Sequence, residues 1–214
     1  MAAQRFTVAD LAALAPHWDA AVDRTPGTDA FCSASAWSFS AAGSFPDVDP
    51  PDLVGDGQAF CGLRAVRTGE GTRVLVGLDP VWGFASPVVG RPDSAAAMLR
   101  RRLRLSPFDH AIVSGQRDDS SLTAWIVRLL GDEHRLLRGP AQERLLIDLT
   151  DGVDGWLGRR SPRFRQRARQ LQRRDEGIEF ADVSAMPPDE LFDRILDVEA
   201  RTWKAAEGTG RVAV

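Results

Sequence analysis

The stretch QAFCGLRAVRTGEGTRVLVGLDPVWGFASPVV, residues 58–89, decides the fold class. It contains three short segments rich in aliphatic and aromatic residues, at 58–67, 72–78 and 81–89. Gly69 and Gly71 lie between the first two segments, and glycines at such a position are typical of a hairpin turn. The stretch therefore predicts three consecutive antiparallel strands in a meander.

Two helices are predicted before this meander. Thr7 and Asp10 form a pattern typical of a capped helix start, and Pro16 is expected to kink or divide the helix that follows. The apolar residues of this helix recur at helical spacing: Leu11, Leu14, Trp18 and Val22. A second, shorter helix is predicted at residues 31–45. The proline, glycine and aspartate content of residues 47–57 predicts a loop.

After residue 91 the pattern changes from consecutive strands to an alternation of helices and strands. Helices are predicted at residues 93–105 and 118–130, and strands at 108–114, 134–138 and 144–149. The complete order is helix, helix, three strands, helix, strand, helix, strand, strand. Such an order predicts an α/β fold with a mixed sheet.

The composition is that of an ordinary globular protein. Of the 214 residues, 43% are hydrophobic and 27% are charged, and the formal net charge is −3. The two cysteines, Cys32 and Cys61, make no disulfide framework, and no apolar run approaches the roughly 20 residues of a membrane-spanning helix. We therefore expect a cytoplasmic protein without a membrane partner. His17, His110 and His134 are isolated from other ligand types, so no metal is expected.

The stretch that begins at Arg159 is unusually basic. No acid occurs between this residue and Arg174, while Phe164, Ala168 and Leu171 recur at helical spacing. These features predict an amphipathic helix with a narrow apolar stripe and a wide cationic surface. Its arginines are Arg159, Arg160, Arg163, Arg165, Arg167, Arg169, Arg173 and Arg174. The surface is either a solvated helix face or a binding site for coenzyme A phosphates, an acidic substrate or a tRNA acceptor stem.

Another helix is predicted after Gly177, which ends the basic helix, and after a β-like segment at residues 178–183. It opens at Pro187 and Pro188 and has two acids in its first turn, as a helix N-terminus favours. One face carries four residues: Phe192, Leu196, Glu199 and Trp203.

Two charged residues of this helix are candidates for chemistry. Glu199 lies within the apolar stripe, so it is either a general base with a raised pKa or a carboxylate that reaches water at the edge of the stripe. Lys204 either binds a carboxylate or phosphate or only complements the helix dipole.

The element order resembles the GNAT acetyltransferase fold, in which a three-strand meander precedes the alternating part. Residues 161–180 and 196–210 also resemble the junction into the second domain of tandem-GNAT proteins, a group that includes cellulose-biosynthesis-type acetyltransferases and, more distantly, Fem-type aminoacyl transferases. In that group an arginine-rich helix, a strand and a helix ending in Trp-Lys introduce the half that binds the acyl donor. The matching positions here are Arg163, Arg167, Trp203 and Lys204, which the resemblance implies bind the substrate or an anion, with Glu199 as the catalytic candidate.

One loop departs from the pattern of the family. A GNAT domain binds the acyl-CoA pyrophosphate with backbone N–H groups at the start of the helix after its fourth strand, in a glycine-rich loop. The corresponding residues 88–93 contain only one glycine, Gly90. Pro92 removes a donor and Asp93 would repel phosphate. The first domain is therefore expected to be degenerate.

We expect a GNAT-like domain at residues 1–155 and the incomplete start of a second at residues 156–214. The expected activity is transfer of an acetyl or other acyl group from acyl-CoA to a small-molecule or peptide amine. The acyl-CoA site is expected to lie outside this chain, which alone should not be competent and should contact a missing domain or partner chain. The alternatives are a Fem-type transferase that uses aminoacyl-tRNA and a non-catalytic module whose basic helix binds nucleic acid or another anion. No Gly-x-Ser-x-Gly motif supports a hydrolase.

Overall fold

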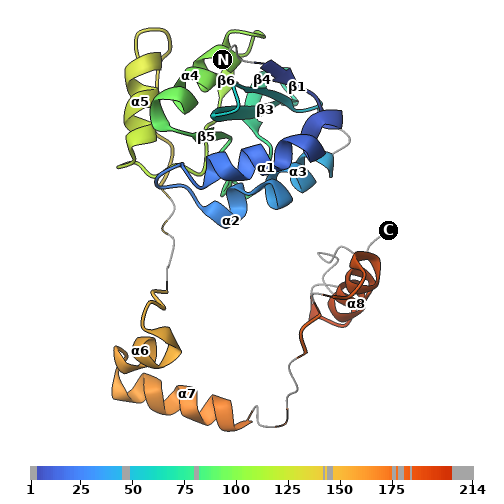
Figure 1. Ribbon diagram of the computed structural model, residues 1–214, viewed down its shortest axis with the longest axis vertical. Helices are drawn as coiled ribbons and strands as arrows, with labels where there is room; N and C mark the ends of the chain where they lie inside the picture. Colours follow the sequence, from blue (N-terminus) through green and yellow to red (C-terminus); the bar gives the residue numbers. More distant parts are fainter. Residues whose placement is uncertain are drawn as a thin grey trace. The chain divides into compact units, whose positions relative to one another are not determined.

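A computed structural model describes residues 4–44, 49–79, 82–141, 143, 147–174, 177, 181–183 and 185–203. The chain forms two compact units, Met1–Pro140 (unit 1) and Ala141–Val214 (unit 2). Unit 1 has a sheet with helices packed on it, and the described elements of unit 2 are helices (Figure 1). The predicted domains, 1–155 and 156–214, remain a prediction.

The elements of unit 1 follow one another in an α/β order. The strands are β1 (Gln4–Phe6), β2 (Asp52–Gly55), β3 (Ala59–Arg67), β4 (Arg73–Gly77), β5 (Val88–Gly90) and β6 (His110–Ala111). The helices are η1 (Val8–Asp10), α1 (Leu11–Val22), α2 (Ala30–Ser33), α3 (Ser35–Gly43), α4 (Pro92–Leu103) and α5 (Ser121–Leu130). Neighbouring strands in the order β1-β2-β3-β4 are antiparallel, whereas β4 and β6 are parallel. The predicted α/β fold with a mixed sheet is therefore confirmed.

Strand β3 is the longest, and β4 and β5 both pair with the same edge of it. Leu63 of β3 pairs with β2 on one side and with Gly77 of β4 on the other. Cys61 of β3 pairs with β2 and with Val88 of β5 in the same way. Strands β4 and β5 therefore lie end to end along β3, separated by residues 78–87. The predicted meander is wrong in its last step, because the third segment extends the second strand instead of pairing with it.

The first helix begins as the sequence predicts. The N–H and the hydroxyl of Thr7 donate to Asp10 Oδ2 at 2.7 and 2.8 Å, and α1 follows directly after η1. Pro16 lies inside α1 and does not divide it. Leu14 and Trp18, on either side of the proline, are both buried, so packing holds the helix together where one backbone hydrogen bond is lost.

The single helix predicted at residues 31–45 is two helices, α2 and α3, in the described residues up to Ser44. Asp29 caps α2 by accepting the Cys32 N–H at 2.8 Å. Asp19 of α1 accepts the N–H of Ser35 at 2.7 Å and its hydroxyl at 2.8 Å. This second carboxylate comes from another helix, so the start of α3 is fixed by a tertiary contact.

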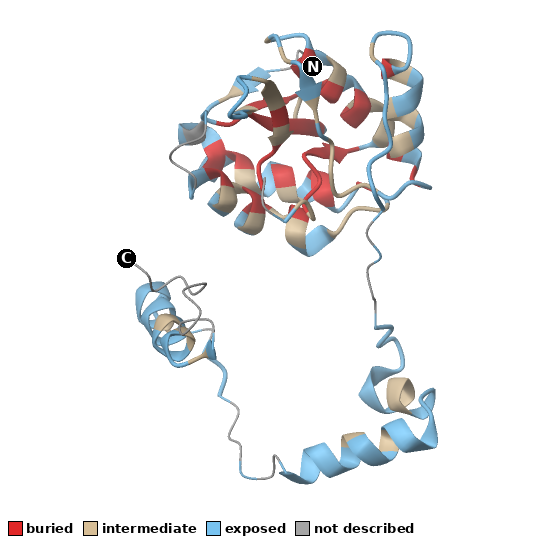
Figure 2. Ribbon diagram, turned by 180° about the vertical axis from the view of Figure 1, so that it is seen from behind, coloured by how far each residue is buried: buried red, intermediate tan, exposed pale blue. Residues whose placement is uncertain are grey.

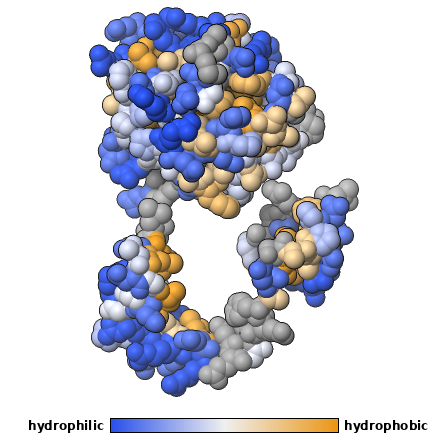
Figure 3. Space-filling view, in the orientation of Figure 1, coloured by the Kyte–Doolittle hydropathy of each residue, from blue (hydrophilic) through white to orange (hydrophobic). Residues whose placement is uncertain are grey.

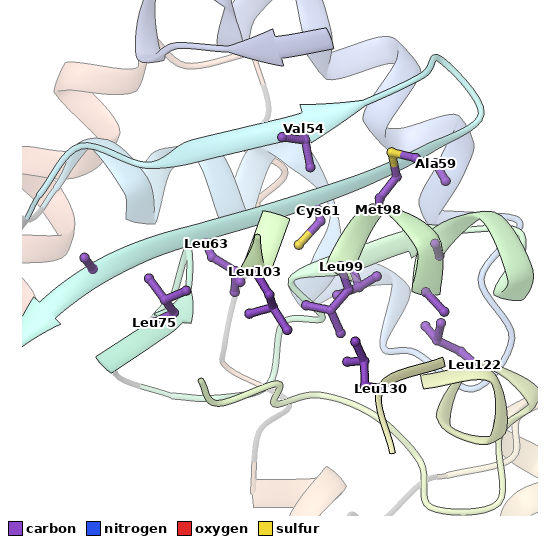
Figure 4. Close-up of a cluster of buried hydrophobic side chains, with 14 residues drawn as sticks. Val54, Ala59, Cys61, Leu63, Leu75, Met98, Leu99, Leu103, Leu122 and Leu130 are labelled. Carbon is purple, nitrogen blue, oxygen red and sulfur yellow. The ribbon is translucent and has the colours of Figure 1, made fainter. Parts of the chain in front are cut away.

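Two apolar clusters fill the two faces of the sheet. One lies under α1 and α3 and includes Leu53 and Phe60, while the other lies under α4 and α5 and includes Val54 and Cys61 (Figure 4). Neighbouring residues of β2 and β3 thus point to opposite faces, and both faces are covered by helices. All strongly buried positions drawn in Figure 2 lie in unit 1, and none of the residues of the unit 2 helices is buried.

Several other predictions can be compared with the fold. The segments at 58–67 and 72–78 are strands β3 and β4, and the helices at 93–105 and 118–130 are α4 and α5. The loop predicted at 47–57 is wrong in its centre, because Leu53 and Val54 are buried on opposite faces and make β2.

The strands predicted late in the chain are mostly absent from the described residues. The predicted strand 108–114 is reduced to β6, and residues 134–138 form no strand. Of the strands predicted at 144–149 and 178–183, residues 147–149 and 181–183 are not in strands, and the rest lie outside the described residues. Val81 of the predicted segment 81–89 also lies outside them, and residues 82–87 are not in a strand.

The two cysteines differ in accessibility. Cys61 is fully buried whereas Cys32 is half-buried. Burial, opposed by the charge of Arg102 and aided by that of Asp52, raises the pKa of the Cys61 thiol to about 12. The neutral thiol is therefore the form that the core accommodates.

We predict that a thiol reagent modifies Cys32 in the native protein at about pH 8 and leaves Cys61 unmodified until unfolding. Because the thiol pKa is 9.0 without burial and about 12 in the fold, this group stabilises the fold fully below pH 9.0 and loses that contribution as pH rises towards 12. Denaturant titrations should show that the free energy of unfolding falls less with rising pH in the Cys61→Ala variant than in the unchanged chain. Equal native reaction rates for both thiols would contradict the burial of Cys61.

Candidate functional site

The first candidate site is the start of α4, where the resemblance would place the pyrophosphate of acyl-CoA. Pro92 is the first residue of the helix and has no N–H. Asp93 follows it, and the backbone N–H of Ser94 foremost, together with the Arg91 guanidinium, holds the pKa of the Asp93 carboxyl below its usual range. The N–H of Ala95 donates to the carbonyl of Arg91 at 2.7 Å. This helix start therefore has one N–H group fewer than usual and carries the Asp93 carboxylate where a phosphate would lie, and both features disfavour phosphate binding.

Close backbone packing also fills the approach to this helix start. Gly90 has a φ of 122°, and a Cβ atom there would lie 2.6 Å from the Cα of Ala59. Its N–H donates to Thr25 Oγ1 at 2.7 Å. The glycine of this loop thus serves the packing of β5 against β3, and its N–H is not available to a ligand.

Replacing Gly90 with alanine should destabilise unit 1 by about 1–3 kcal/mol, because alanine tolerates this backbone conformation poorly and its methyl group would meet β3. Gly69→Ala is the matched control, since a Cβ at Gly69 would meet no atom within 4 Å. Chemical denaturation of the two variants measures the difference. Equal stability of both variants would contradict the close packing at Gly90.

The second candidate site is the cationic surface of unit 2, on helices α6 (Gly152–Gly158) and α7 (Pro162–Arg174). The helix predicted within residues 159–174 is confirmed as α7. Among the described residues, five of its arginines have no ion-pair or hydrogen-bond partner: Arg163, Arg167, Arg169, Arg173 and Arg174. Arg165 differs, since it donates to the carbonyl oxygens of Gly158 and Arg160 at 3.2 and 2.5 Å.

Arginines of unit 1 are used differently. Arg100 and Arg104 share the carboxylate of Glu133, and the side chain of Arg102 is buried beside Asp52 at 3.4 Å. Those guanidinium groups are compensated within the fold. Helix α7 instead contains six arginines and no acid, so it concentrates positive charge, as a site for an anionic ligand requires.

An apolar stripe accompanies these arginines. Trp156 of α6 contacts Phe164 of α7 edge to face, with ring centroids 5.6 Å apart, and Arg160 lies over the Trp156 ring at 4.7 Å. Phe164 and Leu171 remain 44% and 49% exposed. Figure 3 shows the stripe in orange beside the blue polar surface of the same helices. The helices α6 and α7 are therefore amphipathic with an uncovered apolar side.

Helix α8 (Pro188–Ala200) carries the remaining predicted site residues. Glu199 is half-buried and lines a hollow of about 250 Å³. Trp203 lies beyond the end of α8, is 65% exposed and lines the same hollow. The other lining residues are Ile195, Val198 and Thr202. Lys204 lies outside the described residues.

The structure thus brings the predicted residues together in two pairs. Glu199 and Trp203 share one hollow, and Arg163 and Arg167 lie one helical turn apart on α7. No hydrogen bond or ion pair between described residues joins the two pairs. Two apolar residues that line the hollow, Ile195 and Val198, were not among the predicted site residues. They lie four positions and one position before Glu199, and this spacing could have indicated them.

The described residues contain no group of three or more histidine, cysteine or acidic side chains suited to a metal ion. None of the helices in the described part of the chain combines the length and apolar character needed to cross a membrane.

Comparisons with known proteins add no further assignment. A scan against protein-family models and searches of curated proteins and of solved structures found no match to the chain.

Proposed function

We propose that the protein is an N-acyltransferase of the tandem-GNAT type, which transfers an acyl group from acyl-CoA to an amine, and that unit 1 is its scaffold half. The observation that carries the proposal is the strand arrangement around β3. Because β4 and β5 act as one interrupted strand, four antiparallel strands precede α4, and the parallel strand β6 and α5 follow it. The likeness to the expected GNAT order is partial: antiparallel strands precede the helix α4, and a strand and a helix follow it.

The start of α4 supports the scaffold role of unit 1. Pro92 removes one first-turn N–H group, and Asp93 adds negative charge where an acyl-CoA pyrophosphate would need to lie. The acyl donor therefore binds elsewhere than unit 1.

In the proposed reaction the amine nitrogen attacks the thioester carbonyl carbon, a C–N bond forms and the C–S bond breaks. The proton lost by the amine passes to the Glu199 carboxylate, and the leaving thiolate takes up a proton. Arg163 and Arg167 bind phosphate groups of the donor, because guanidinium groups form paired hydrogen bonds with phosphate oxygens. The indole of Trp203, exposed beside Glu199, packs against the substrate.

A second candidate function is favoured by the five arginines of α7 that lack partners among the described residues. Such a surface suits a polyanion, so transfer from aminoacyl-tRNA by a Fem-type enzyme, or nucleic-acid binding by a non-catalytic module, are the alternatives. These alternatives predict an affinity that falls steeply with salt.

We predict that Arg163→Glu/Arg167→Glu weakens binding of the anionic ligand by at least tenfold at low salt, because two attractive charges become repulsive. Calorimetric titration with acetyl-CoA and, separately, with a mixture of tRNAs measures the effect. Arg67→Glu/Arg135→Glu makes the same change of net charge in unit 1 and should leave the affinity unchanged.

The outcomes separate the candidate functions. Binding of acetyl-CoA that requires Arg163 and Arg167 supports the acyltransferase, and amine-dependent release of free coenzyme A thiol is expected only when the second domain is complete. Binding of tRNA alone with a steep salt dependence supports the second candidate. Acetyl-CoA binding that survives Arg163→Glu/Arg167→Glu would contradict the assigned arginines.

A further inference from the structure

Unit 1 contains a hollow of about 240 Å³ that the proposed function does not use. Residues of β1, α1 and β3 line it, together with the turn between β2 and β3. Its apolar side chains are Phe6, Leu14 and Phe60, and its polar side chains are Gln4, His17 and Asp56. An apolar wall with a few polar groups is the usual form of a site for a small ligand.

The register of the sheet explains why the hollow lies at this place. Gln4 of β1 pairs with Gly55 of β2, and Gly55 pairs with Phe60 of β3, so the three residues form one row across the sheet. A Cβ atom at Gly55 would lie 2.1 Å from Phe60 Cδ1, because the phenyl ring lies over the glycine. Leu14 and His17, three residues apart on α1, line the same hollow. Regular elements therefore hold most of its wall in place.

The turn between β2 and β3 fixes the carboxylate of Asp56. Asp56 Oδ1 accepts the N–H of Gln58 at 2.8 Å and the N–H of Ala59 at 3.0 Å. No hydrogen bond or ion pair between described residues uses the other oxygen, Oδ2. The half-buried carboxylate is thus held by one oxygen and keeps the other for a ligand.

Two arginines of neighbouring elements interact with other groups. Arg5 of β1 donates to Asp52 Oδ1 at 2.7 Å and to Asp52 Oδ2 at 2.9 Å. Arg24 donates to the carbonyl oxygen of Gln58 at 3.4 Å. Neither arginine forms an ion pair with Asp56 in the described part of the chain, so the negative charge at the hollow is not compensated by them.

His17 and Gln4 add acceptors to this charge. Among the described residues, neither side chain makes a hydrogen bond. A neutral imidazole has one acceptor nitrogen, and the side-chain amide of glutamine has an acceptor oxygen. With Asp56 Oδ2 the hollow has three acceptor groups, which equals the number of N–H donors of an ammonium group. Because the carboxylate is the charged group among them, the set favours a cation over an anion.

We propose that this hollow binds a small organic amine. The ammonium group of the ligand donates to Asp56, with His17 and Gln4 as further acceptors. Its apolar body packs on the rings of Phe6 and Phe60, whose centroids are 6.2 Å apart. Aromatic rings beside a carboxylate suit an organic cation, because the ring faces carry partial negative charge. The inference goes beyond the proposed function, since none of these residues is assigned to acyl transfer.

Titration of the whole chain with benzylamine, followed through backbone amide chemical shifts by NMR, tests the proposal. We expect saturable shift changes at Phe6, Gly57 and Gln58. Asp56→Asn should weaken the binding about tenfold, because a charge-assisted hydrogen bond is lost. The amide oxygen of the new side chain can still accept the two N–H groups of the turn, so the fold should be retained. The matched control Asp132→Asn removes an exposed acid after α5 and should leave the affinity unchanged.

A second measurement uses the unchanged chain and needs no variant. Benzyl alcohol has the same ring with a hydroxyl group in place of the ammonium group, and it should bind about tenfold more weakly than benzylamine. Benzoate carries the opposite charge and should cause no saturable shift changes at the hollow.

Three results would overturn the proposal. These are equal affinity for benzylamine and benzyl alcohol, an affinity that Asp56→Asn leaves unchanged, and benzylamine-induced shift changes that do not include Phe6, Gly57 and Gln58. Shift changes at Ile195 and Val198 would report binding at the hollow of Glu199 and would bear on the proposed acyl transfer instead. No measurement requires acyl-CoA or turnover, so the amine site and the acyl transfer can each fail while the other stands.

Discussion

Unit 1 depends on strand β3, which pairs with other strands along both of its edges and is buried on both of its faces. One edge of β3 is occupied by β2, and the other is shared end to end by β4 and β5. Its residues alternate between the cluster under α1 and the cluster under α4, so every element of unit 1 is placed relative to this strand. The position of β5 in turn fixes where α4 begins and how closely Gly90 approaches Ala59.

That placement has a chemical consequence. A strand followed directly by a helix is a common setting for phosphate binding, because the first helical N–H groups are free to donate. In this protein Pro92 has no N–H group to give, and the Asp93 carboxylate adds negative charge at the same helix start. The start of α4 is thus poorly suited to a phosphate group. The free positive charge lies in unit 2, on α7.

The sequence predicts those parts of the fold that depend on local pattern. The capped start at Thr7 and Asp10, the helix α4 with its terminal proline and the amphipathic α7 were all predictable from spacing alone. Tertiary contacts decided the rest. The separation of α2 from α3 at Ala34 depends on Asp19, which lies in another helix and caps the start of α3. The short segment Asp52–Gly55 forms β2 because it pairs with β3. For the site, residue types indicated Arg163, Arg167, Glu199 and Trp203, but no local pattern could say which of them share a surface.

We propose that the acyl donor binds outside unit 1, because Pro92 and Asp93 make the start of α4 unfavourable for a phosphate group. Backbone amide chemical shifts followed by NMR during addition of acetyl-CoA test it most directly. We expect shift changes at amides of α7, including Arg163 and Arg167, and none at Asp93, Ser94 or Ala95. Changes confined to the first turn of α4 would show that this helix start binds the donor and would contradict the account.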